Sequence, residues 1–286
     1  MTLAIIIPAF NEELFLQNTL QSVVSQSQWP DHVIVIDDNS TDNTAEIAHS
    51  FAKAYPFIKV FTNKSKPIHQ PGGKVIDAFK KGLEQLEHEV DLLLKLDADI
   101  ILPENYIAEL CSYFEMHPRC GMAGGVAWIE KNGAWQMEQL TNTDHIRGAF
   151  KAYRTAFYKQ MGGLPSAMGW DTWDELMAHY YGWSIYVNQE WQLKHLKVTG
   201  KSYHVDAHKR QGQAFYQLGY GFVLTGIASI KLALKKGKPS LAYYYVLGYI
   251  FSYYQNLPKI VTKEQEIFIR NLRWRGILKK LKLTEA

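Results

Sequence analysis

Two aspartates, Asp97 and Asp99, stand two positions apart at the end of the apolar run VDLLLKLDADI. Carboxylates that leave a buried strand are costly to desolvate unless a positive group meets them. A hard divalent cation bound to a diphosphate would meet them, because such a cation takes one or two carboxylates plus substrate oxygens. A strand that simply ends in solvated aspartates is the alternative, so the pair indicates a metal site without establishing one.

A second acidic pair, Asp37 and Asp38, leaves another apolar run, HVIVIDD. A carboxylate at this place could accept a hydrogen bond from a nucleobase imide or a ribose hydroxyl. The residues that follow, 39–42, fit the chemistry of a turn and a helix cap. Two adjacent acids at the end of an apolar strand are harder to assign to a turn alone, so this pair is a second candidate binding element.

Strands and helices alternate through the first hundred residues, and this alternation decides where the two acidic pairs lie. Apolar runs predict strands at 3–10, 32–38, 58–63 and 90–100. Amphipathic stretches predict helices at 12–25 and 72–87, and residues 38–55 predict a turn followed by a helix. This alternation predicts a parallel, doubly wound sheet with right-handed crossovers. Because ligands bind beyond the carboxyl ends of the strands in such sheets, the polar segments PAFNE, DDNS and DAD should meet at one edge.

Length and charge suggest two parts with different tasks. The 286 residues fit one catalytic domain with a C-terminal elaboration better than two full domains. Residues 201–286 carry 15 Lys/Arg and 4 Asp/Glu, a balance of +11, whereas residues 1–200 carry 16 and 24, a balance of −8. The basic part lacks a recognisable nucleic-acid module, so we expect no nucleic-acid partner.

The start of the chain and its cysteines predict a cytoplasmic protein. The first apolar run is short, lacks a basic flank and leads directly into polar residues, which is typical of a buried strand rather than a signal peptide. The two cysteines, Cys111 and Cys120, do not have the spacing of a metal site. We expect both to be reduced thiols.

The order of the motifs PAFNEE, VIDDNSTDNT, GGK and KLDAD resembles the nucleotide-binding half of the family 2 glycosyltransferases. The resemblance covers residues 3–102 and implies an α/β fold of the GT-A type, with a Rossmann-like, mostly parallel sheet and flanking helices. We expect the catalytic domain to span residues 1–200, with a nucleotide-binding half to residue 102 and an acceptor half at 103–200. A basic, aromatic helical C-terminal extension would follow at 201–286.

The resemblance also implies roles for individual residues. The nucleotide-sugar pocket would be lined by the end of the first strand, a base-binding aspartate, a lysine after the glycine pair and the first aspartate of the DAD triplet: Pro8, Ala9, Asn11, Glu12, Asp38, Lys74 and Asp97. Asp99 would hold a divalent metal, Mn²⁺ or Mg²⁺. Lys74 is equally compatible with an ordinary lysine at a helix start.

The acceptor half departs from the family pattern. Members carry a Glu-Asp pair that opens a helix ending in Gly-aromatic, whereas Trp170 stands before Asp171 in this chain. Asp171 lies 11 residues before Gly182, the family spacing for the catalytic base, and Asp174 is the competing candidate. A helix cap at Asp171 is also compatible with the sequence, and a capping carboxylate can still act as a base.

His195 opens the stretch HLKVTG, which resembles a His-x-Arg/Lys-x-Thr-Gly stretch in a subset of the family. In that subset the histidine completes the metal shell, so the resemblance implies His195 as a second metal ligand. A satisfied core histidine or a surface histidine is the alternative.

Together these features predict an inverting, metal-dependent glycosyltransferase. A sugar would pass from a nucleotide diphosphate, a UDP-sugar, to an acceptor hydroxyl during polysaccharide or glycolipid synthesis. The metal would offset charge on the leaving phosphate, and Asp171 would deprotonate the hydroxyl on the opposite face. A sugar nucleotidyltransferase, which usually opens with a Gly-rich triphosphate loop, and a non-catalytic nucleotide-sugar-binding protein are the alternatives.

Two uncharged windows, 215–230 and 241–254, are rich in tyrosine or glycine and fall short of a span of roughly 20 residues. Tyrosine favours the headgroup region of a bilayer, and each flanking basic residue adds about 1 kcal/mol at an anionic surface. We therefore expect peripheral contact with the cytoplasmic face of the inner membrane. A helical subdomain whose tyrosines pack against the catalytic core or a second subunit is the alternative.

Overall fold

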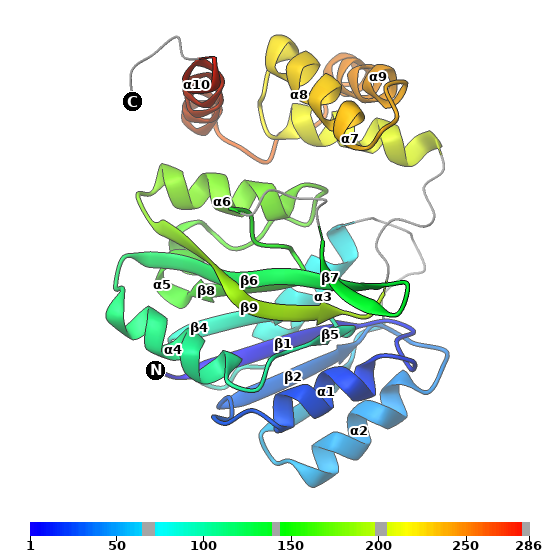
Figure 1. Cartoon of the computed structure of the whole chain (residues 1–286), viewed down its shortest axis with the longest axis vertical. Coiled ribbons are helices and arrows are strands. Elements are labelled where there is room, and N and C mark those ends of the chain that lie inside the picture. The colour runs from blue at the N-terminus through cyan, green and yellow to red at the C-terminus, as the bar shows by residue number, and fades with distance from the viewer. Residues whose placement is uncertain (65–71, 139–143, 198–204, 282–286) are drawn as a thin grey trace. The chain divides into compact units, whose positions relative to one another are not determined.

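A single sheet organises the N-terminal part of the chain in the computed structural model, which describes residues 1–64, 72–138, 144–197 and 205–281 (Figure 1). Within these residues the strand order is β3-β2-β1-β4-β8-β6-β9-β5, and β7 pairs with β6. The strands are β1 (Leu3–Ala9), β2 (His32–Asp37), β3 (Ile58–Thr62), β4 (Leu92–Leu96), β5 (Ile100–Ile101), β6 (Cys120–Lys131), β7 (Ala134–Met137), β8 (Phe150–Arg154) and β9 (Ser184–His195).

Helices cover both faces of this sheet (Figure 1). One face carries α1, α2 and α4, and the other carries α3 and α5. The bounds of these helices are α1 (Leu16–Val24), α2 (Thr44–Ala54), α3 (Gly73–Leu83), α4 (Tyr106–Met116) and α5 (Thr155–Gln160). Because helices shield both faces, β1, β2 and β4 are apolar along nearly their whole length.

The predicted α/β fold with a largely parallel, helix-flanked sheet is confirmed. Strands β3, β2, β1 and β4 all run parallel. Beyond β4 the pairing is mixed: β8 is antiparallel to both β4 and β6, while β6 and β9 are parallel. The strand expected at 90–100 is in fact two strands, because the chain turns at residues 97–99 between β4 and β5.

The chain divides into two compact units. The first unit comprises Met1–Ser166 and Met177–Thr199, and the second comprises Ala167–Leu176 and Gly200–Ala286. Helix α6 (Trp170–Tyr180) contributes residues to both. The second unit also holds α7 (Val205–Gln217), α8 (Phe222–Lys235), α9 (Leu241–Tyr254) and α10 (Lys263–Lys280).

Two glycines bring α7 and α9 into direct backbone contact. A Cβ on Gly212 would lie 1.8 Å from the carbonyl oxygen of Tyr245, and one on Gly248 would lie 1.9 Å from that of Lys209. Neither position therefore has room for a side chain. The buried side of α9 includes Tyr245 and Gly248, so this crossing forms the centre of the second unit.

Two further features bear on the sequence expectations. No helix in the described part of the chain is long and apolar enough to span a bilayer. Cys111 and Cys120 are buried free thiols, and burial raises the pKa of each to about 11. Both therefore stay protonated and unreactive at neutral pH.

Candidate functional site

The carboxyl ends of β1 and β2 lie side by side, as the register pairs Ala9 with Asp37. Each strand is followed by an asparagine with positive φ, 52° at Asn11 and 64° at Asn39. Asparagine is one of the few residues that adopts this left-handed conformation readily. The chain therefore turns sharply at both places and keeps the polar residues that follow near the sheet edge.

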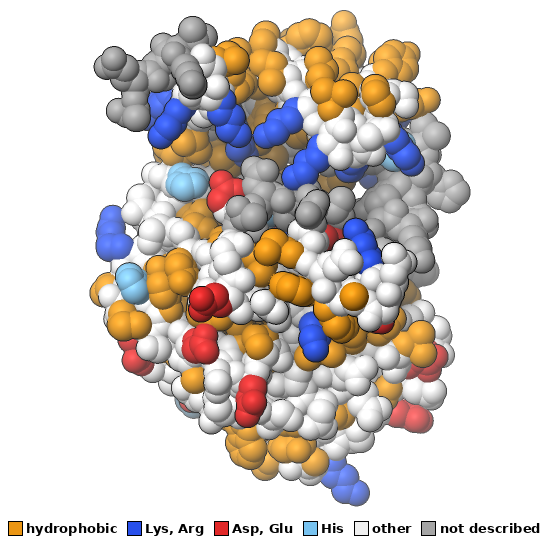
Figure 2. Space-filling view, viewed as in Figure 1, with side chains coloured by type: hydrophobic (Ala, Val, Ile, Leu, Met, Phe, Trp, Pro, Cys, Tyr) orange, Lys and Arg blue, Asp and Glu red, His pale blue; other side chains and the backbone are white. Residues whose placement is uncertain are grey.

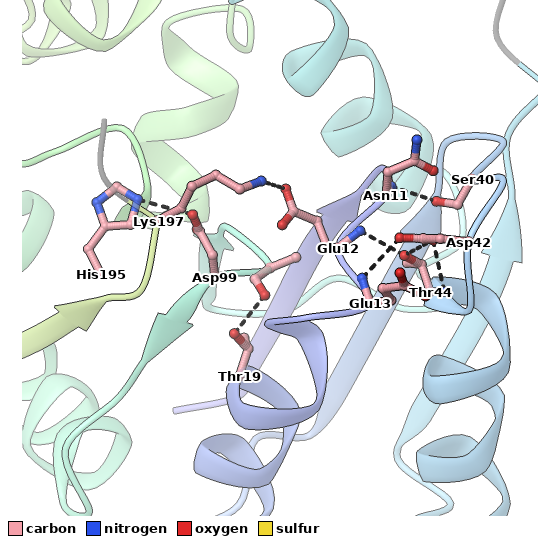
Figure 3. A network of polar contacts seen from close by, with 11 residues as sticks. Asn11, Glu12, Glu13, Thr19, Ser40, Asp42, Thr44, Asp99, His195 and Lys197 are labelled. Atoms are coloured by element: carbon pink, nitrogen blue, oxygen red, sulfur yellow. Dashed lines mark hydrogen bonds and ion pairs between the residues drawn. The ribbon is translucent and has the colours of Figure 1, made fainter. Parts of the chain in front are cut away.

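These two turns are bound to each other (Figure 3). Asn11 accepts a hydrogen bond from the backbone N–H of Thr41 at 2.8 Å, and its own N–H donates to Ser40 Oγ at 3.0 Å. The N–H of Glu12 donates to Thr44 Oγ1 at 2.7 Å. The polar groups of this segment thus fix the shape of the edge. They confirm the turn that the sequence suggests, whereas Asn43, the N-cap of α2, makes no side-chain cap hydrogen bond.

Asp37 and Asp38 are both buried, with exposed fractions of 3% and 7%. Asn63 Nδ2 donates to Asp38 Oδ1 at 2.7 Å, and the N–H of Ser40 donates to Asp37 Oδ1 at 3.3 Å. Asn63 was not among the predicted site residues, although it ends the run that predicts β3. It holds the carboxylate that the sequence assigns to the nucleobase.

A buried lysine, also absent from the predicted set, holds Asp97. Lys95 is 1% exposed, and its ammonium donates to Asp97 Oδ1 and to the carbonyl of Gly148. Residues two apart on a strand project to the same face, so Lys95 reaches Asp97 directly. Lys151, also fully buried, lies opposite Lys95 in the register of β4 and β8. A single lysine inside the run LLLKL was the signal that could have found this contact.

Asp99 and His195 meet because β5 pairs with the end of β9, where Ile100 lies opposite His195. The distance from Asp99 Oδ2 to His195 Nε2 is 3.2 Å, and each residue is 7% exposed. Burial lowers the pKa of His195, but the hydrogen bond to Asp99 and the charges of Asp99 and Asp97 outweigh it, so the pKa is raised. The turn between the strands is braced by Thr19 Oγ1, which donates to the carbonyl of Ala98 at 2.8 Å.

Glu12 lies between this pair and the bound turns (Figure 3). Lys197 Nζ contacts Glu12 Oε1 at 2.5 Å, and Glu12 Oε2 is buried without a hydrogen-bond partner among the described residues. Burial raises the pKa of Glu12, Lys197 opposes this shift, and the charges of Asp99 and Asp97 add to it. Glu12, Asp97, Asp99 and His195 therefore share one anionic neighbourhood.

The donor atoms in this neighbourhood fit a hard divalent cation that shares its shell with a ligand. Among the described residues, no three His, Cys, Asp or Glu side chains lie close enough to form a complete metal cage. Asp99 and His195 supply two donors. Mg²⁺-type ions usually take few protein ligands and fill their shells with phosphate oxygens and water, so two donors are sufficient.

Three predicted pocket residues lie nearby in the fold. Pro8 and Ala9 end β1, and Ala9 is buried. Lys74 stands in the first turn of α3, which begins after Gly72 in a left-handed conformation with φ of 77° and packs against β1 and β2. Lys74 is half-buried at this helix start. In the HLKVTG stretch, residues 198–200 lie outside the described part of the chain.

The two candidate bases, Asp171 and Asp174, belong to the second unit. Asp171 is half-exposed in the first turn of α6, after Gly169 with φ of 85°. Asp174 is fully buried, and its Oδ1 accepts the N–H of Glu175 at 2.7 Å. The structure thus gathers the predicted strand-end residues and His195 in the first unit, and it distinguishes the two base candidates by burial.

Comparison with known proteins identifies the family of the chain. A sequence model of glycosyl transferase family 2 matches residues 4–171. The poly-beta-1,6-N-acetyl-D-glucosamine synthase of Staphylococcus epidermidis is 28% identical over 125 residues, which cover 43% of this chain and 28% of that protein. The probable glycosyltransferase YdaM of Bacillus subtilis is 35% identical over 98 residues, covering 34% and 22%. The chain therefore matches less than a third of the length of these relatives.

Solved structures of similar fold extend further along the chain. Residues 1–349 of S. aureus TarS, in complex with UDP-GlcNAc, superpose with a TM-score of 0.59 at 17% identity, covering 90% of this chain and 92% of that one. The mannosyltransferase PcManGT of Pyrobaculum calidifontis, in complex with GDP-Man and Mn²⁺, gives a TM-score of 0.59 at 14% identity, covering 98% and 82%. At these identities the likeness shows a shared fold.

Proposed function

The chain belongs to glycosyl transferase family 2, and from this premise we propose that it is an inverting, metal-dependent glycosyltransferase that uses a nucleotide-diphosphate sugar. The observation that carries the proposal is the buried Asp99–His195 pair, which lies in one anionic neighbourhood with Glu12 and Asp97. Asp99 is buried with His195, and Glu12 Oε2 is buried without a hydrogen-bond partner among the described residues, so this neighbourhood favours a cation and its ligand.

The proposed donor is a UDP-sugar. Asp38, held by Asn63, would accept a hydrogen bond from the base, and the end of β1 would form the pocket wall. Asp97 would contact the ribose or the sugar, and Lys74 would help to hold the nucleotide. The TarS complex with UDP-GlcNAc supports a uridine donor, whereas the PcManGT complex with GDP-Man shows that this fold also accepts guanosine.

The proposed acceptor is a saccharide or a lipid-linked saccharide that is extended during polysaccharide or glycolipid synthesis. The name of the Staphylococcus relative, a polysaccharide synthase, supports this class. We also propose a cytoplasmic location with peripheral contact at the inner membrane, which the charge balance of +11 over residues 201–286 supports.

The proposed chemistry assigns separate tasks to these residues. Asp99 and His195 would hold a divalent metal, which supplies Lewis-acid stabilisation of the leaving diphosphate. Lys95 keeps the carboxylate of Asp97 in one orientation. A carboxylate oxygen of Asp171 would take the proton of the acceptor hydroxyl, and the N-terminal end of α6 favours its negative charge. Attack from the face opposite the leaving group inverts the anomeric centre.

Donor binding is tested first, by thermal unfolding with UDP-GlcNAc, UDP-glucose, UDP-galactose and GDP-mannose, each with Mn²⁺ or with a chelator. A ligand at 100 times its Kd that binds only the folded state adds about 2.7 kcal/mol, which raises the melting temperature measurably. We expect at least one UDP-sugar to raise it, and only with metal. If no donor does so in either condition, the proposed donor site is wrong.

Turnover is then measured with the stabilising donor and saccharide acceptors, and NMR of the product reports its anomeric configuration. Inversion is the expected result, and retention would contradict the single-displacement mechanism. Incubation with UTP and sugar 1-phosphates is a parallel arm, because release of pyrophosphate would identify a nucleotidyltransferase instead. Binding without turnover in either arm would indicate a non-catalytic nucleotide-sugar-binding protein.

A further inference from the structure

Helix α8 in the second unit buries two hydroxyl side chains and exposes several large aliphatic ones. Its buried side includes Thr225 and Ser229, both fully buried, and neither hydroxyl has a hydrogen-bond partner among the described residues. Large aliphatic side chains are instead exposed, by 61% at Val223, 57% at Ile230 and 62% at Leu234. Burying two hydroxyls while exposing several large aliphatic side chains is unfavourable in water, and an apolar cover over the exposed side would remove the second cost.

The exposed aliphatic residues form one stripe. Val223, Ile227, Ile230 and Leu234 are spaced by four, three and four positions, which places them on one face of a helix. An isolated exposed leucine needs no explanation, but four branched aliphatic side chains in one row are unusual on a surface that faces only water.

Helix α9 presents a second apolar face. Tyr243, Phe251 and Tyr254 are exposed by 64%, 60% and 82%, and their spacing of eight and three positions puts them on the same side of the helix. No charged residue occurs in the helix sequence LAYYYVLGYIFSYY. Because α8 packs against α9, the two faces belong to one region, which we call the α8–α9 surface. Figure 2 shows hydrophobic side chains gathered on the end of the second unit that holds these helices.

Charge indicates what covers this surface. Residues 207–263 contain eight Lys/Arg and no Asp/Glu. Lys235, Lys236 and Lys238 are exposed at the C-terminal end of α8, directly beside the aliphatic stripe. A second copy of this chain is disfavoured, because a symmetric contact would bring the same basic surface against itself. Anionic lipid headgroups supply the opposite charge, and tyrosine side chains prefer that interfacial depth.

We propose that the α8–α9 surface docks on an anionic lipid bilayer, with the aliphatic stripe of α8 in the boundary between headgroups and acyl chains and the lysines at the lipid phosphates. This inference rests on the peripheral location proposed above and names the surface that makes the contact. Neither helix crosses the bilayer; both lie along it, as interfacial amphipathic helices do. A membrane-bound acceptor would then be held in the same plane as the enzyme.

The test is sedimentation of the full-length protein with vesicles of phosphatidylcholine alone or mixed with phosphatidylglycerol. We expect binding to the mixed vesicles only. Binding should weaken at high salt, because salt screens the attraction between the lysines and the lipid phosphates. The double variant Ile230→Gln, Leu234→Gln should bind at least about tenfold more weakly, since it removes two aliphatic side chains whose burial favours the membrane-bound state. The double variant Lys235→Gln, Lys238→Gln should lose the preference for anionic lipid.

Ile267→Gln on α10 is the matched control, because Ile267 is 60% exposed but lies outside the α8–α9 surface, and it should bind like the unmodified protein. Equal loss in this control, or an unmodified protein that binds neither vesicle, overturns the proposal. Sedimentation velocity without vesicles adds a further outcome: a dimer that the Ile230, Leu234 variant dissociates would identify a protein interface instead. The metal-dependent thermal shift with UDP-sugars is measured on every variant, so failure of donor binding is distinguished from failure of membrane docking.

Discussion

Several charged side chains of the first unit lie inside the protein: Asp37 is 3% exposed, Lys95 1%, Asp99 7% and Lys151 not at all. On α8 in the second unit, by contrast, Thr225 and Ser229 are buried, and Ile230 and Leu234 face outward. The first unit thus buries charge at the carboxyl ends of its strands, and the second exposes apolar surface along a helix. Both arrangements are costly in water unless something else meets them.

Each unit has a feature that a partner would compensate. A buried carboxylate is tolerated where a cation or a hydrogen-bond donor compensates it, which agrees with the small charged ligand that we propose for the first unit. An exposed aliphatic stripe is tolerated where an apolar phase covers it, which agrees with the membrane surface that we propose for the second unit. The opposite charge balances of the two halves of the sequence agree with these two tasks.

Substitution of Asp171 tests the comparison between the two units most directly, because Asp171 is the proposed catalytic group that belongs to the second unit. Asp171→Asn should reduce turnover by about 10²–10⁴-fold with little change in donor affinity, since a general base acts in the transition state. Steady-state kinetics and the donor-dependent thermal shift measure the two effects separately.

Asp174→Asn is its counterpart. Because Asp174 is buried and accepts the N–H of Glu175, its substitution should lower the melting temperature while the folded fraction retains turnover. If Asp174→Asn is stable but inactive while Asp171→Asn stays active, Asp174 is the catalytic base and Asp171 is not.

Asp99→Asn should reduce turnover by roughly a hundredfold, an expectation within the several kcal/mol that a metal contributes to stabilising charge in the transition state. The Mn²⁺-dependent part of the thermal shift with UDP should disappear, while the far-UV circular dichroism spectrum stays unchanged. Asp91→Asn is the matched control, because Asp91 is exposed and directly precedes the opposite end of β4. If Asp99→Asn retains the full Mn²⁺-dependent thermal shift, the assignment of the metal to Asp99 and His195 is wrong.

Asp97→Asn tests the cost of buried charge in the first unit. The substitution removes the negative charge that faces the buried ammonium of Lys95, so we expect the free energy of unfolding to fall by about 3 kcal/mol. This value is the lower end of the range for a broken buried ion pair, because the Asp97 side chain is one-third exposed. Urea denaturation measures it. Lys59→Gln, which breaks the exposed Lys59–Glu87 pair, should leave stability nearly unchanged. If both variants lose the same amount of stability, the burial of Lys95 does not depend on its contact with Asp97.

Gly248→Ala tests the centre of the second unit. The new methyl group would meet the carbonyl of Lys209, so we expect α7 and α9 to separate at a cost of about 1–3 kcal/mol. Gly226→Ala in α8 is the control: nothing lies within 4 Å of the added carbon, and replacing a helical glycine should stabilise the protein by about 0.5–1 kcal/mol. Thermal unfolding compares them, and an unaffected Gly248→Ala protein would contradict the close crossing.

Periodicity along the chain was sufficient to predict the elements of the first hundred residues. Alternation of apolar runs with amphipathic stretches predicts β1 to β4 and α1 to α3, because each of these elements carries its apolar residues at the period of its own secondary structure. The same pattern places the acidic strand ends at one edge, which follows from parallel pairing alone. Motif order within residues 3–102 then predicts the family.

Contacts between distant segments decided the rest of the site. Asn63 holds Asp38, Lys95 holds Asp97, and His195 reaches Asp99 across 96 positions because β9 pairs with β5. No local pattern encodes these pairs, since the register of a long-range strand pairing depends on the whole sheet. The same limit applies to Asp171 and Asp174, which are three positions apart: Asp174 is fully buried, whereas Asp171 is half-exposed.

The order of residues decides which side chains are available: an acidic, strand-ending set before residue 200 and an uncharged, tyrosine-rich set with flanking lysines after it. Packing in three dimensions sets which way they face. The composition of α8 is apolar in any orientation, but packing against α9 turns Thr225 and Ser229 inward and Ile230 and Leu234 outward. Orientation is a property of packed neighbours, because a helix carries the same residues around its whole circumference whichever side is buried.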